Sequence, residues 1–487
     1  MKKRFLAAVL AAVMAVTALT GCSSQTETTA APEAQTAPEA QTSAEDKTTE
    51  AAKPETTAAA TTEATVETTA EPTAESTTHA VEAVTTEAEE ELKALAGPAY
   101  MGGGLMPIEE TEVEAEDLSE EDQNAMDRAM RAYTPGKTLL VNNAKEFYYY
   151  SQMPKDAQIL YDAMLMVAED PVNPDNIVKA VISTDPYSTE FSQMYMTAYY
   201  GMLYDHAELF WLYNQIEADF QLAVPRMDDA PKGKHSVYIM MEKPYENYKK
   251  EVNAFNDAVE AFLADIDLTA SDAEIAKAIH DKLIETVTYN TPVMEDTGST
   301  GFYNLAHTAY GALVADNNGT PNYAVCDGYS QAYVYLLQQA GINAAVIVGI
   351  AGGSQATAGG HAWTVVQLDG EWYEVDSTWD DIGSIEASIE SIKDTDAFSY
   401  KYYHEAVVDS KYRDMVQHYL FNVTTDKITD FKADKSFNYV SKDQKYTYSL
   451  IGNSVHIRAN TGMKGYGVYG YAVQYAPVAT GTVHAYK

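Results

Sequence analysis

The sequence of 487 residues predicts an α+β protein, and three observations lead to that prediction. A capping box from Ser271 to Glu274 begins a helix whose apolar residues recur every four positions. The continuous apolar run at 344–350 is typical of a buried strand. The dipeptide Asp369-Gly370 separates two alternating segments and supplies the turn of a β-hairpin. Helices and antiparallel strands are therefore both expected.

Composition and charge exclude several classes of function. Hydrophobic residues make up 46% of the chain and charged residues 21%, as in globular proteins. The formal net charge of −40 argues against nucleic-acid binding, which requires a basic surface, and against attraction to anionic lipid headgroups. Two cysteines are too few for a disulfide framework or for a cysteine-rich zinc site.

The first 22 residues have the pattern of a secretory leader. Basic residues at 2–4 precede an apolar run that is too short for a comfortable membrane span. The closing Leu19-Thr20-Gly21-Cys22 resembles the lipobox of bacterial lipoproteins, in which the cysteine is lipidated and becomes the mature N-terminus. We therefore expect residues 1–21 to be a lipoprotein signal peptide and Cys22 to anchor the protein to the membrane, outside the cytoplasm. The alternative is an ordinary leader with an incidental cysteine.

Residues 22–119 predict a disordered acidic stalk. Thr, Ala, Glu, Pro, Ser and Gln dominate the first part of it, which includes a tandem APEAQT repeat at 31–42. Such a segment buries too little apolar surface to offset the entropy of ordering. Residues 23–122 contain 25 acidic residues and three lysines, a net charge of −22, so about half of the total charge of −40 lies outside the expected folded part.

The folded part is expected to begin near residue 120, where residues 120–268 predict a helix-rich region. Apolar spacing indicates helices at 157–167 and 245–266, and residues 236–241 alternate as a strand does. The aromatic residues of this region are interpreted as core, and we find no catalytic motif in it.

The C-terminal residues 431–487 predict a small β-rich appendage. Alternating segments at 446–451, 455–458 and 466–475 are interpreted as its strands. We expect the appendage to pack against the domain that precedes it.

Cys326 lies at the predicted start of a helix that ends at Gly341. Unpaired N–H groups at a helix N-terminus favour a thiolate over a thiol, and they can also receive an oxyanion. A lone cysteine is more often a small buried hydrophobe, and that alternative stays open for Cys326 taken alone.

The hairpin predicts that His361 and Asp376 share one face. With Asp369-Gly370 as the turn, residue 368 pairs with 371, and Asp376 lies opposite Trp363. Diagonal neighbours are about 7–8 Å apart, which is within side-chain reach. A carboxylate in that position can orient an imidazole whose other nitrogen serves a nucleophile.

Aromatic residues accompany this pair. Three of the four tryptophans, Trp363, Trp372 and Trp379, are expected to form the walls of a substrate cleft. Aromatic walls exclude water and thereby strengthen the electrostatic interactions within a site.

The segment from about Ala273 to Phe421 resembles the transglutaminase-like superfamily, in particular its bacterial branch. The shared motifs are Ile279-His280-Asp281, His307 to Gly311, Val325 to Tyr329, Gly360 to Trp363, and Val375 to Asp381. The resemblance covers about a third of the chain and implies a papain-like domain at 269–430. It also implies that Cys326 is the nucleophile, His361 the general base and then acid, and Asp376 the residue that orients the ring.

The sequence departs from papain-like peptidases at the oxyanion donor. Thr320 stands six residues before Cys326, where those enzymes have a glutamine. Tyr310 is the candidate for a side-chain donor, and packing is the alternative role. We expect no cofactor and no metal ion, and we interpret Asp380 and Asp381 as turn or capping residues.

The sequence thus predicts a membrane-anchored cysteine enzyme that attacks amide bonds through a thioester. Hydrolysis is the expected outcome, as in a peptidase or amidase, and the expected substrate is a protein or peptide, for example of the cell envelope. One alternative is a protein cross-linking transglutaminase. The other is a non-enzymatic binding scaffold with the same fold.

Overall fold

The structure, a computed structural model, describes residues 81–83, 99–100, 144–169, 177–213, 219–223, 230–243, 248–296, 304–449 and 451–486. The signal peptide, Cys22 and most of the predicted stalk lie outside these residues. Within the described residues, no helix combines the length and the apolar character needed to cross a membrane.

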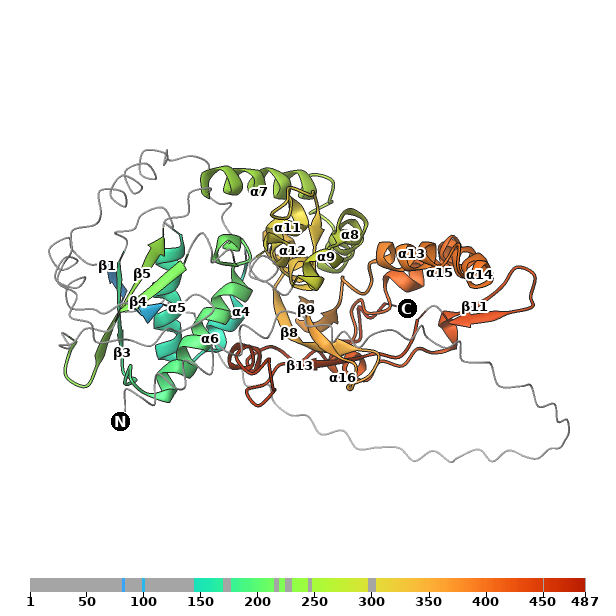
Figure 1. The fold of residues 1–487 in the computed structure, drawn as a ribbon. Coiled ribbons are helices and arrows are strands. Elements are labelled where there is room, and N and C mark those ends of the chain that lie inside the picture. The colour runs from blue at the N-terminus through green and yellow to red at the C-terminus, as the bar shows by residue number, and fades with distance from the viewer. Residues whose placement is uncertain are drawn as a thin grey trace, which may run out of the picture. The chain divides into compact units, whose positions relative to one another are not determined.

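The N-terminal part of the described chain contains a five-stranded antiparallel sheet, whereas the sequence predicts mainly helices there. Its strand order is β1-β3-β5-β4-β2 (Figure 1). The bounds are Val81–Ala83 (β1), Ala99–Tyr100 (β2), Val178–Ile182 (β3), Asp219–Ala223 (β4) and His235–Lys243 (β5). Strand β5 contains the predicted strand at 236–241. The two edge strands, β1 and β2, come from the range that we predict as stalk.

The same part of the chain contains four helices, with bounds Tyr148–Gln152 (α4), Lys155–Ala168 (α5), Thr189–Asp205 (α6) and Tyr248–Leu263 (α7). Helix α5 packs on β3 and β5 through fully buried residues such as Leu160 and Met164. Helix α6 begins after Ser188, whose hydroxyl accepts a hydrogen bond from the N–H of Phe191. The Tyr149 hydroxyl of α4 donates to the backbone carbonyl of Val346 over 2.5 Å, which connects this region to the central sheet described next.

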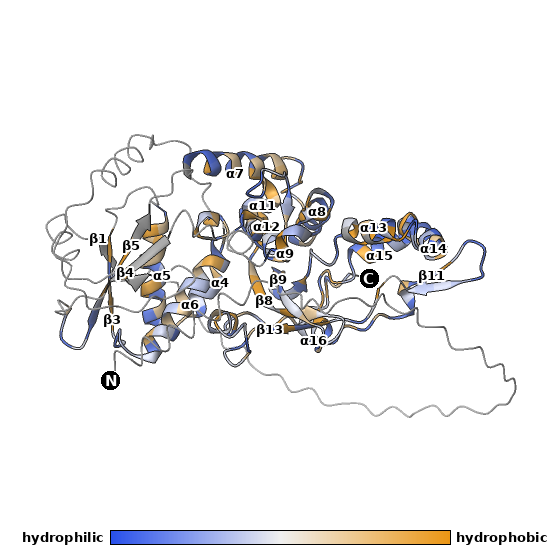
Figure 2. Ribbon diagram, viewed as in Figure 1, coloured by the Kyte–Doolittle hydropathy of each residue, from blue (hydrophilic) through white to orange (hydrophobic). Residues whose placement is uncertain are grey.

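The central sheet has four antiparallel strands in the order β10-β9-β8-β13. Their bounds are Ala344–Gly352 (β8), Gly359–Leu368 (β9), Glu371–Val375 (β10) and Val455–Arg458 (β13). Helix α12 (Cys326–Gln339) packs on β8 and β9, and α8 (Asp272–Thr286) packs on α12. Helix α8 has the predicted capping box, in which the side chains of Ser271 and Glu274 bond each other's backbone N–H groups. Figure 2 shows that β8 is mainly hydrophobic, as a strand inside a core should be.

The predicted hairpin register is confirmed. Glu371 pairs with Leu368, and the pairing continues without a shift to the end of β10. Asp369 and Gly370 have φ angles of 50° and 84°. Two successive positive φ angles define the type I′ turn that suits the twist of a hairpin.

Strand β13 comes from the predicted C-terminal appendage and is an edge strand of the central sheet. Arg458 pairs with Gly349 of β8, where the two backbones approach closely. A Cβ atom at position 349 would lie 2.1 Å from the carbonyl oxygen of Ile457, so only glycine fits. The sequence predicts this strand but does not indicate its partner.

The predicted strand at 466–475 is wrong. This segment forms turns and the short helix α17 (Gly470–Val473). Gly465 has a φ angle of 82°, and a Cβ at Gly470 would lie 2.3 Å from the backbone of Asn460. The glycines therefore serve tight turns, which a period-two pattern of tyrosines does not reveal.

The remaining elements connect these parts. They are η1 (Phe210–Tyr213), β6 (Thr288–Tyr289), α9 (Thr291–Glu295), η2 (Leu305–His307), α11 (Ala309–Leu313), β7 (Tyr323–Ala324), α13 (Ile382–Ser391), α14 (Ala397–Val407), α15 (Ser410–Gln417), α16 (Thr425–Thr429), η3 (Lys435–Phe437), β11 (Asn438–Val440) and β12 (Thr447–Ser449). Helices α13, α14 and α15 follow the hairpin directly and pack on one another.

Candidate active site

Cys326 is the first residue of α12, as the sequence predicts. Val325 is the N-cap residue and has an extended backbone, and Cys326 is 4% exposed. Gly328 in the first turn is required by packing, because a Cβ there would lie 2.5 Å from the carbonyl oxygen of Ala306. The thiol is therefore held at a helix N-terminus, where the backbone favours negative charge.

His361 and Asp376 meet on the predicted face of the hairpin. The Nε2 atom of His361 lies 2.8 Å from Oδ2 of Asp376, and both side chains are buried. The other carboxylate oxygen, Oδ1, accepts hydrogen bonds from the backbone N–H groups of Thr378 and Trp379, over 3.1 and 3.2 Å. Since Nε2 is used for Asp376, Nδ1 is the ring nitrogen that remains for the thiol.

Electrostatics favour the charged forms of His361 and Asp376. Burial lowers the pKa of His361, but the Asp376 carboxylate and the hydrogen-bonded Cys326 side chain raise it to about 10. Burial raises the pKa of Asp376, but the charge and hydrogen bonds of His361 and His456 hold it well below its ordinary value. At neutral pH the carboxylate is thus ionised and the imidazole protonated, which stabilises a neighbouring thiolate.

Sequence comparisons address the same part of the chain. Residues 260–377 match the family model of the Transglutaminase-like superfamily. The chain contains a transglutaminase-like domain. Members of this superfamily are typically cysteine-based enzymes, and the matched residues include Cys326, His361 and Asp376.

A solved structure described as "Crystal structure of a TGase" is similar to 32% of this chain at 18% identity, with a TM-score of 0.22. The similar region spans 44% of that protein, so this chain matches less than half of its length. No curated protein matches the sequence.

His456 is a second histidine in contact with Asp376. Its Nε2 atom lies 2.9 Å from the same Oδ2 atom of Asp376 that His361 contacts, and its side chain is fully buried. Residue 456 lies outside the matched range 260–377, on β13. The sequence indicates no role for His456 beyond its position in an alternating segment.

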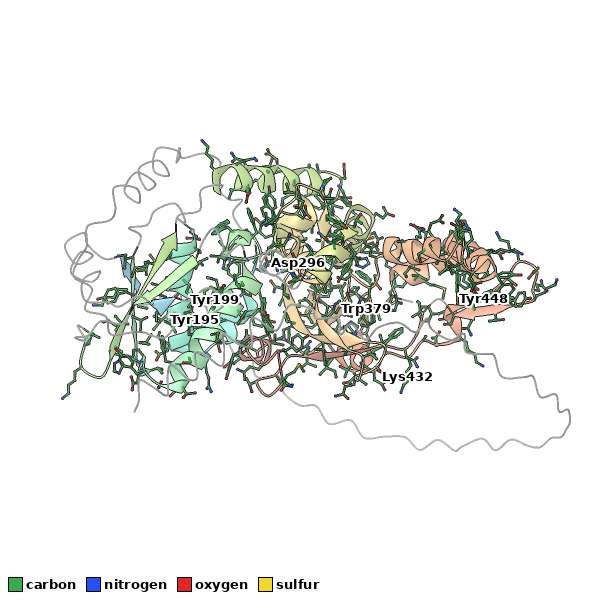
Figure 3. All side chains as sticks on the ribbon, viewed as in Figure 1. Tyr195, Tyr199, Asp296, Trp379, Lys432 and Tyr448 are labelled. Carbon is green, nitrogen blue, oxygen red and sulfur yellow. The ribbon has the colours of Figure 1, made fainter. Side chains whose placement is uncertain are left out.

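Two of the three predicted cleft tryptophans surround the imidazole of His361. The ring centroids of Trp379 and Trp363 lie 5.5 and 6.1 Å from it. Trp379 is labelled among the side chains in Figure 3. Trp372 lies elsewhere, because it precedes Asp376 by four residues along the strand, and it packs against Tyr148 of α4 at 5.1 Å.

The candidate oxyanion donor Tyr310 packs against Phe210, with ring centroids 4.7 Å apart. Burial and the nearby charge of Glu251 raise its pKa to about 12. These contacts fit the packing role, and the oxyanion role stays a prediction. Thr320, which replaces the glutamine of papain-like peptidases, is exposed and donates its backbone N–H to Asp316.

Asp381 has the capping role that we predict. It is the N-cap of α13, where it accepts the N–H of Gly383 over 2.7 Å, and it also accepts the hydroxyl of Tyr329 over 2.8 Å. Asp380 is buried, accepts the N–H of Leu420 and faces His280. Burial raises the pKa of Asp380 to about 6.

Among the described residues, two groups of three side chains have metal-binding atoms within 4.8 Å of one another. One is His361, Asp376 and His456. The other is His280, Asp281 and His418, which the sequence analysis did not bring together because His418 is distant in sequence. In the second group, the ammonium of Lys277 lies 2.6 Å from Asp281 and already balances its charge.

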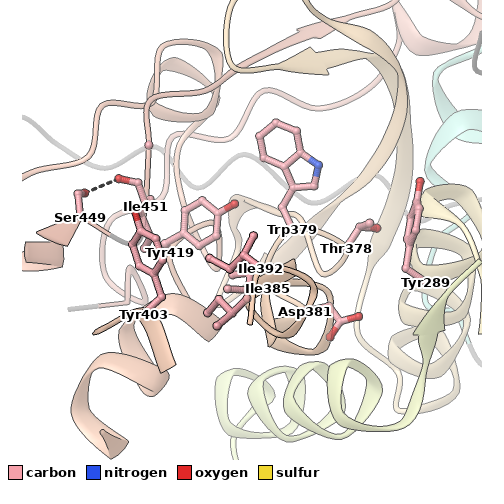
Figure 4. Close-up of a pocket in the computed structure, with 12 residues that line it drawn as sticks. Tyr289, Thr378, Trp379, Asp381, Ile385, Ile392, Tyr403, Tyr419, Ser449 and Ile451 are labelled. Atoms are coloured by element: carbon pink, nitrogen blue, oxygen red, sulfur yellow. Dashed lines mark hydrogen bonds between the residues drawn. The ribbon is translucent and has the colours of Figure 1, made fainter. Parts of the chain in front are cut away.

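A pocket of about 640 Å³ is lined in part by Thr378 and Trp379, whose backbone N–H groups bond Asp376 (Figure 4). Its walls are mainly apolar and aromatic. The other lining residues are Tyr289, Asp381, Ile385, Ile389, Ile392, Tyr403, Tyr419, Ser449, Ile451 and Gly452. The sequence does not indicate this pocket, because its walls combine α13 and α14 with Tyr289 and the β12 segment, which are distant from them in the chain.

Proposed function

We propose that this protein is a thiol-dependent acyl-transfer enzyme that attacks the amide carbonyl of a protein or peptide. The observation that carries the proposal is the buried series of hydrogen bonds from Asp376 through His361 to Cys326. Without it, Cys326 would be an ordinary buried thiol.

The geometry supports a two-step reaction. The thiolate sulfur of Cys326 attacks the carbonyl carbon, and the oxyanion forms near the N-terminus of α12. When the C–N bond breaks, His361 gives its proton to the leaving amine, and a thioester remains on the sulfur. An acceptor then gives a proton to His361 and attacks the thioester, which restores the thiolate.

We infer that water is the acceptor, so that the protein acts as a peptidase or amidase. The sequence has no evident module for a second protein substrate, and water surrounds an enzyme outside the cytoplasm. An amine acceptor would make the protein a cross-linking transglutaminase. A primary amine added to the reaction separates the two, because only a cross-linking enzyme converts most of the acyl groups to the amide.

The pocket beside Trp379 suits an apolar or aromatic side chain of the acyl donor. Ile385, Ile389 and Ile392 supply one face of it from α13 and the residue after it, and Tyr403 supplies another part of the wall. Burial of such a side chain would position the amide next to the triad at a favourable free energy of about 1.5–3 kcal/mol.

Alkylation by iodoacetamide tests the activated thiol. In wild type, Cys326 is expected to react at pH 6 at least about tenfold faster than in His361→Ala, because the imidazolium stabilises the thiolate. The adduct is located by peptide mass spectrometry, which separates Cys326 from Cys22. Equal rates in the two proteins would contradict the proposal and favour the non-enzymatic scaffold.

The proposal includes display on the outer side of the membrane through a lipid on Cys22. Two acyl chains on one residue meet the requirement for stable anchoring. Cys22→Ser is therefore expected to move the protein from the membrane fraction of expressing cells to the medium. Retention of the Cys22→Ser protein on membranes would contradict anchoring at this residue.

A further inference from the structure

We propose that His456 is a positioning residue of the triad, which holds Asp376 by a second imidazole hydrogen bond so that the carboxylate faces His361. This inference rests on the proposed function, because it assigns His456 a task in activating Cys326. It adds a fourth side chain to the site from a strand outside the matched family region.

The sheet places His456 where it can reach the triad. His456 pairs with Ala351 of β8, and Gly349, two residues earlier on β8, pairs with His361 of β9. Directly paired residues lie on the same face, so His456 and His361 extend from one side of the sheet. On this face of β8 the two residues are Gly349 and Ala351, which are small, whereas Ile350 lies on the opposite face. The His456 side chain can therefore reach over them to Asp376.

Among the described residues, four donors hold the carboxylate of Asp376. Oδ1 accepts two backbone N–H groups, and Oδ2 lies between the Nε2 atoms of His361 and His456, at 2.8 and 2.9 Å. The backbone donors fix the carboxyl group only at Oδ1. His456 therefore fixes the position of Oδ2, the atom that orients the imidazole of His361.

The surroundings of His456 define which nitrogen carries its proton. Its Nδ1 atom is buried and has no hydrogen-bond partner among the described residues. A proton on Nδ1 would be an unsatisfied buried donor, so the tautomer with the proton on Nε2 is favoured. The rings of Trp379 and Trp363, with centroids 4.8 and 5.1 Å away, pack around this imidazole and restrict its rotation.

Other ionisable groups near this pair are acidic or already paired. The charge of Asp376 adds to burial in raising the pKa of Asp380 and of Tyr419, so both lie close to it. Arg458, on the same face of β13, is paired with Glu374. Among the described groups, the two imidazoles are thus the ones that stabilise the charge of Asp376 through Oδ2.

The test compares His456→Phe with His456→Gln. Phenylalanine keeps a ring but removes the donor, whereas the amide of glutamine can still donate to Asp376. The probe is iodoacetamide, and the measurement is the rate of Cys326 alkylation between pH 4 and 10. We expect the Phe variant to react about tenfold more slowly at pH 6, with the acid limb of its profile shifted upward by about one pH unit. The Gln variant is expected to stay within about threefold of wild type.

The outcomes separate the two proposals. If Cys326 is alkylated as fast in His361→Ala as in wild type, the proposed function fails. If His361→Ala is slower but His456→Phe has the pH profile of wild type, only the role of His456 fails. The alkylation rate could also fall equally in the Phe and Gln variants at every pH, with no shift of the acid limb. That result would indicate a merely structural role and would overturn the positioning role of His456.

A measurement on the wild-type protein covers the case in which the variants do not fold. The ¹⁵N chemical shifts of selectively labelled histidines report the tautomer of each ring, so this measurement needs no variant. A proton on Nε2 of His456 at pH 7 is the expected result. A proton on Nδ1 alone would overturn the inference, because Nε2 could then not donate to Asp376.

Discussion

Asp376→Asn is expected to lower the rate of Cys326 acylation by about 10⁴-fold, the effect seen when an amide replaces the carboxylate of a catalytic triad. The amide has no negative charge to stabilise the imidazolium of His361, and its NH₂ group would face the N–H of His361. The measurement is the burst of p-nitrophenol from p-nitrophenyl acetate, which reports the formation of the thioester directly.

The matched control for this variant is Asp156→Asn. Asp156 is also a buried acceptor of backbone N–H groups, from Ser183 and Thr184, but it lies in the N-terminal region. We expect this control to lose stability without losing the burst. A burst in Asp376→Asn within about tenfold of wild type would contradict the role assigned to Asp376.

Asp376→Asn also changes how the free energy of unfolding depends on pH. The pKa of His361 is about 10 in the folded protein, above its ordinary value of 6.5, so the protonated ring stabilises the fold fully below about pH 6.5. That contribution is lost as the pH rises through about 10. In Asp376→Asn this alkaline loss is expected to be much smaller, because the carboxylate that raises the pKa is gone. Urea unfolding at pH 7 and pH 10 measures the difference.

The sequence predicts the part of the site that local structure determines. The position of Cys326 is predicted by the start of a helix. The shared face of His361 and Asp376 is predicted by the register that Asp369-Gly370 imposes on one hairpin. In each case the chain separation is short, so turn and capping chemistry suffices.

His456 could not be predicted in the same way, because its place depends on which strand β13 joins. The contact between His456 and Asp376 links residues 80 positions apart. An alternating segment indicates a strand but does not select a partner, and the deciding feature, the close approach at Gly349, is visible only in the fold. The N-terminal sheet was missed for a similar reason, since its edge strands have two or three residues each.

Strand β13 has a second buried contact, between Arg458 and Glu374, and Arg458→Met is expected to lower the free energy of unfolding by about 3 kcal/mol. Glu374 is fully buried, and its Oε1 atom lies 2.5 Å from the guanidinium. Two neutral donors, Trp363 and Thr425, would remain beside an uncompensated carboxylate. Equilibrium unfolding in urea at pH 7 measures the loss.

A double variant and a surface control separate the buried charge from the lost packing of the arginine. Adding Glu374→Gln to Arg458→Met removes the uncompensated charge, so the double variant is expected to regain about 1–3 kcal/mol relative to Arg458→Met. The control is Arg413→Met, which breaks an exposed pair with Glu386 and is expected to cost at most about 1 kcal/mol. If Arg458→Met costs no more than this control, the pair does not hold β13 on the sheet. In that case the position of His456 depends on the strand pairing with β8 alone.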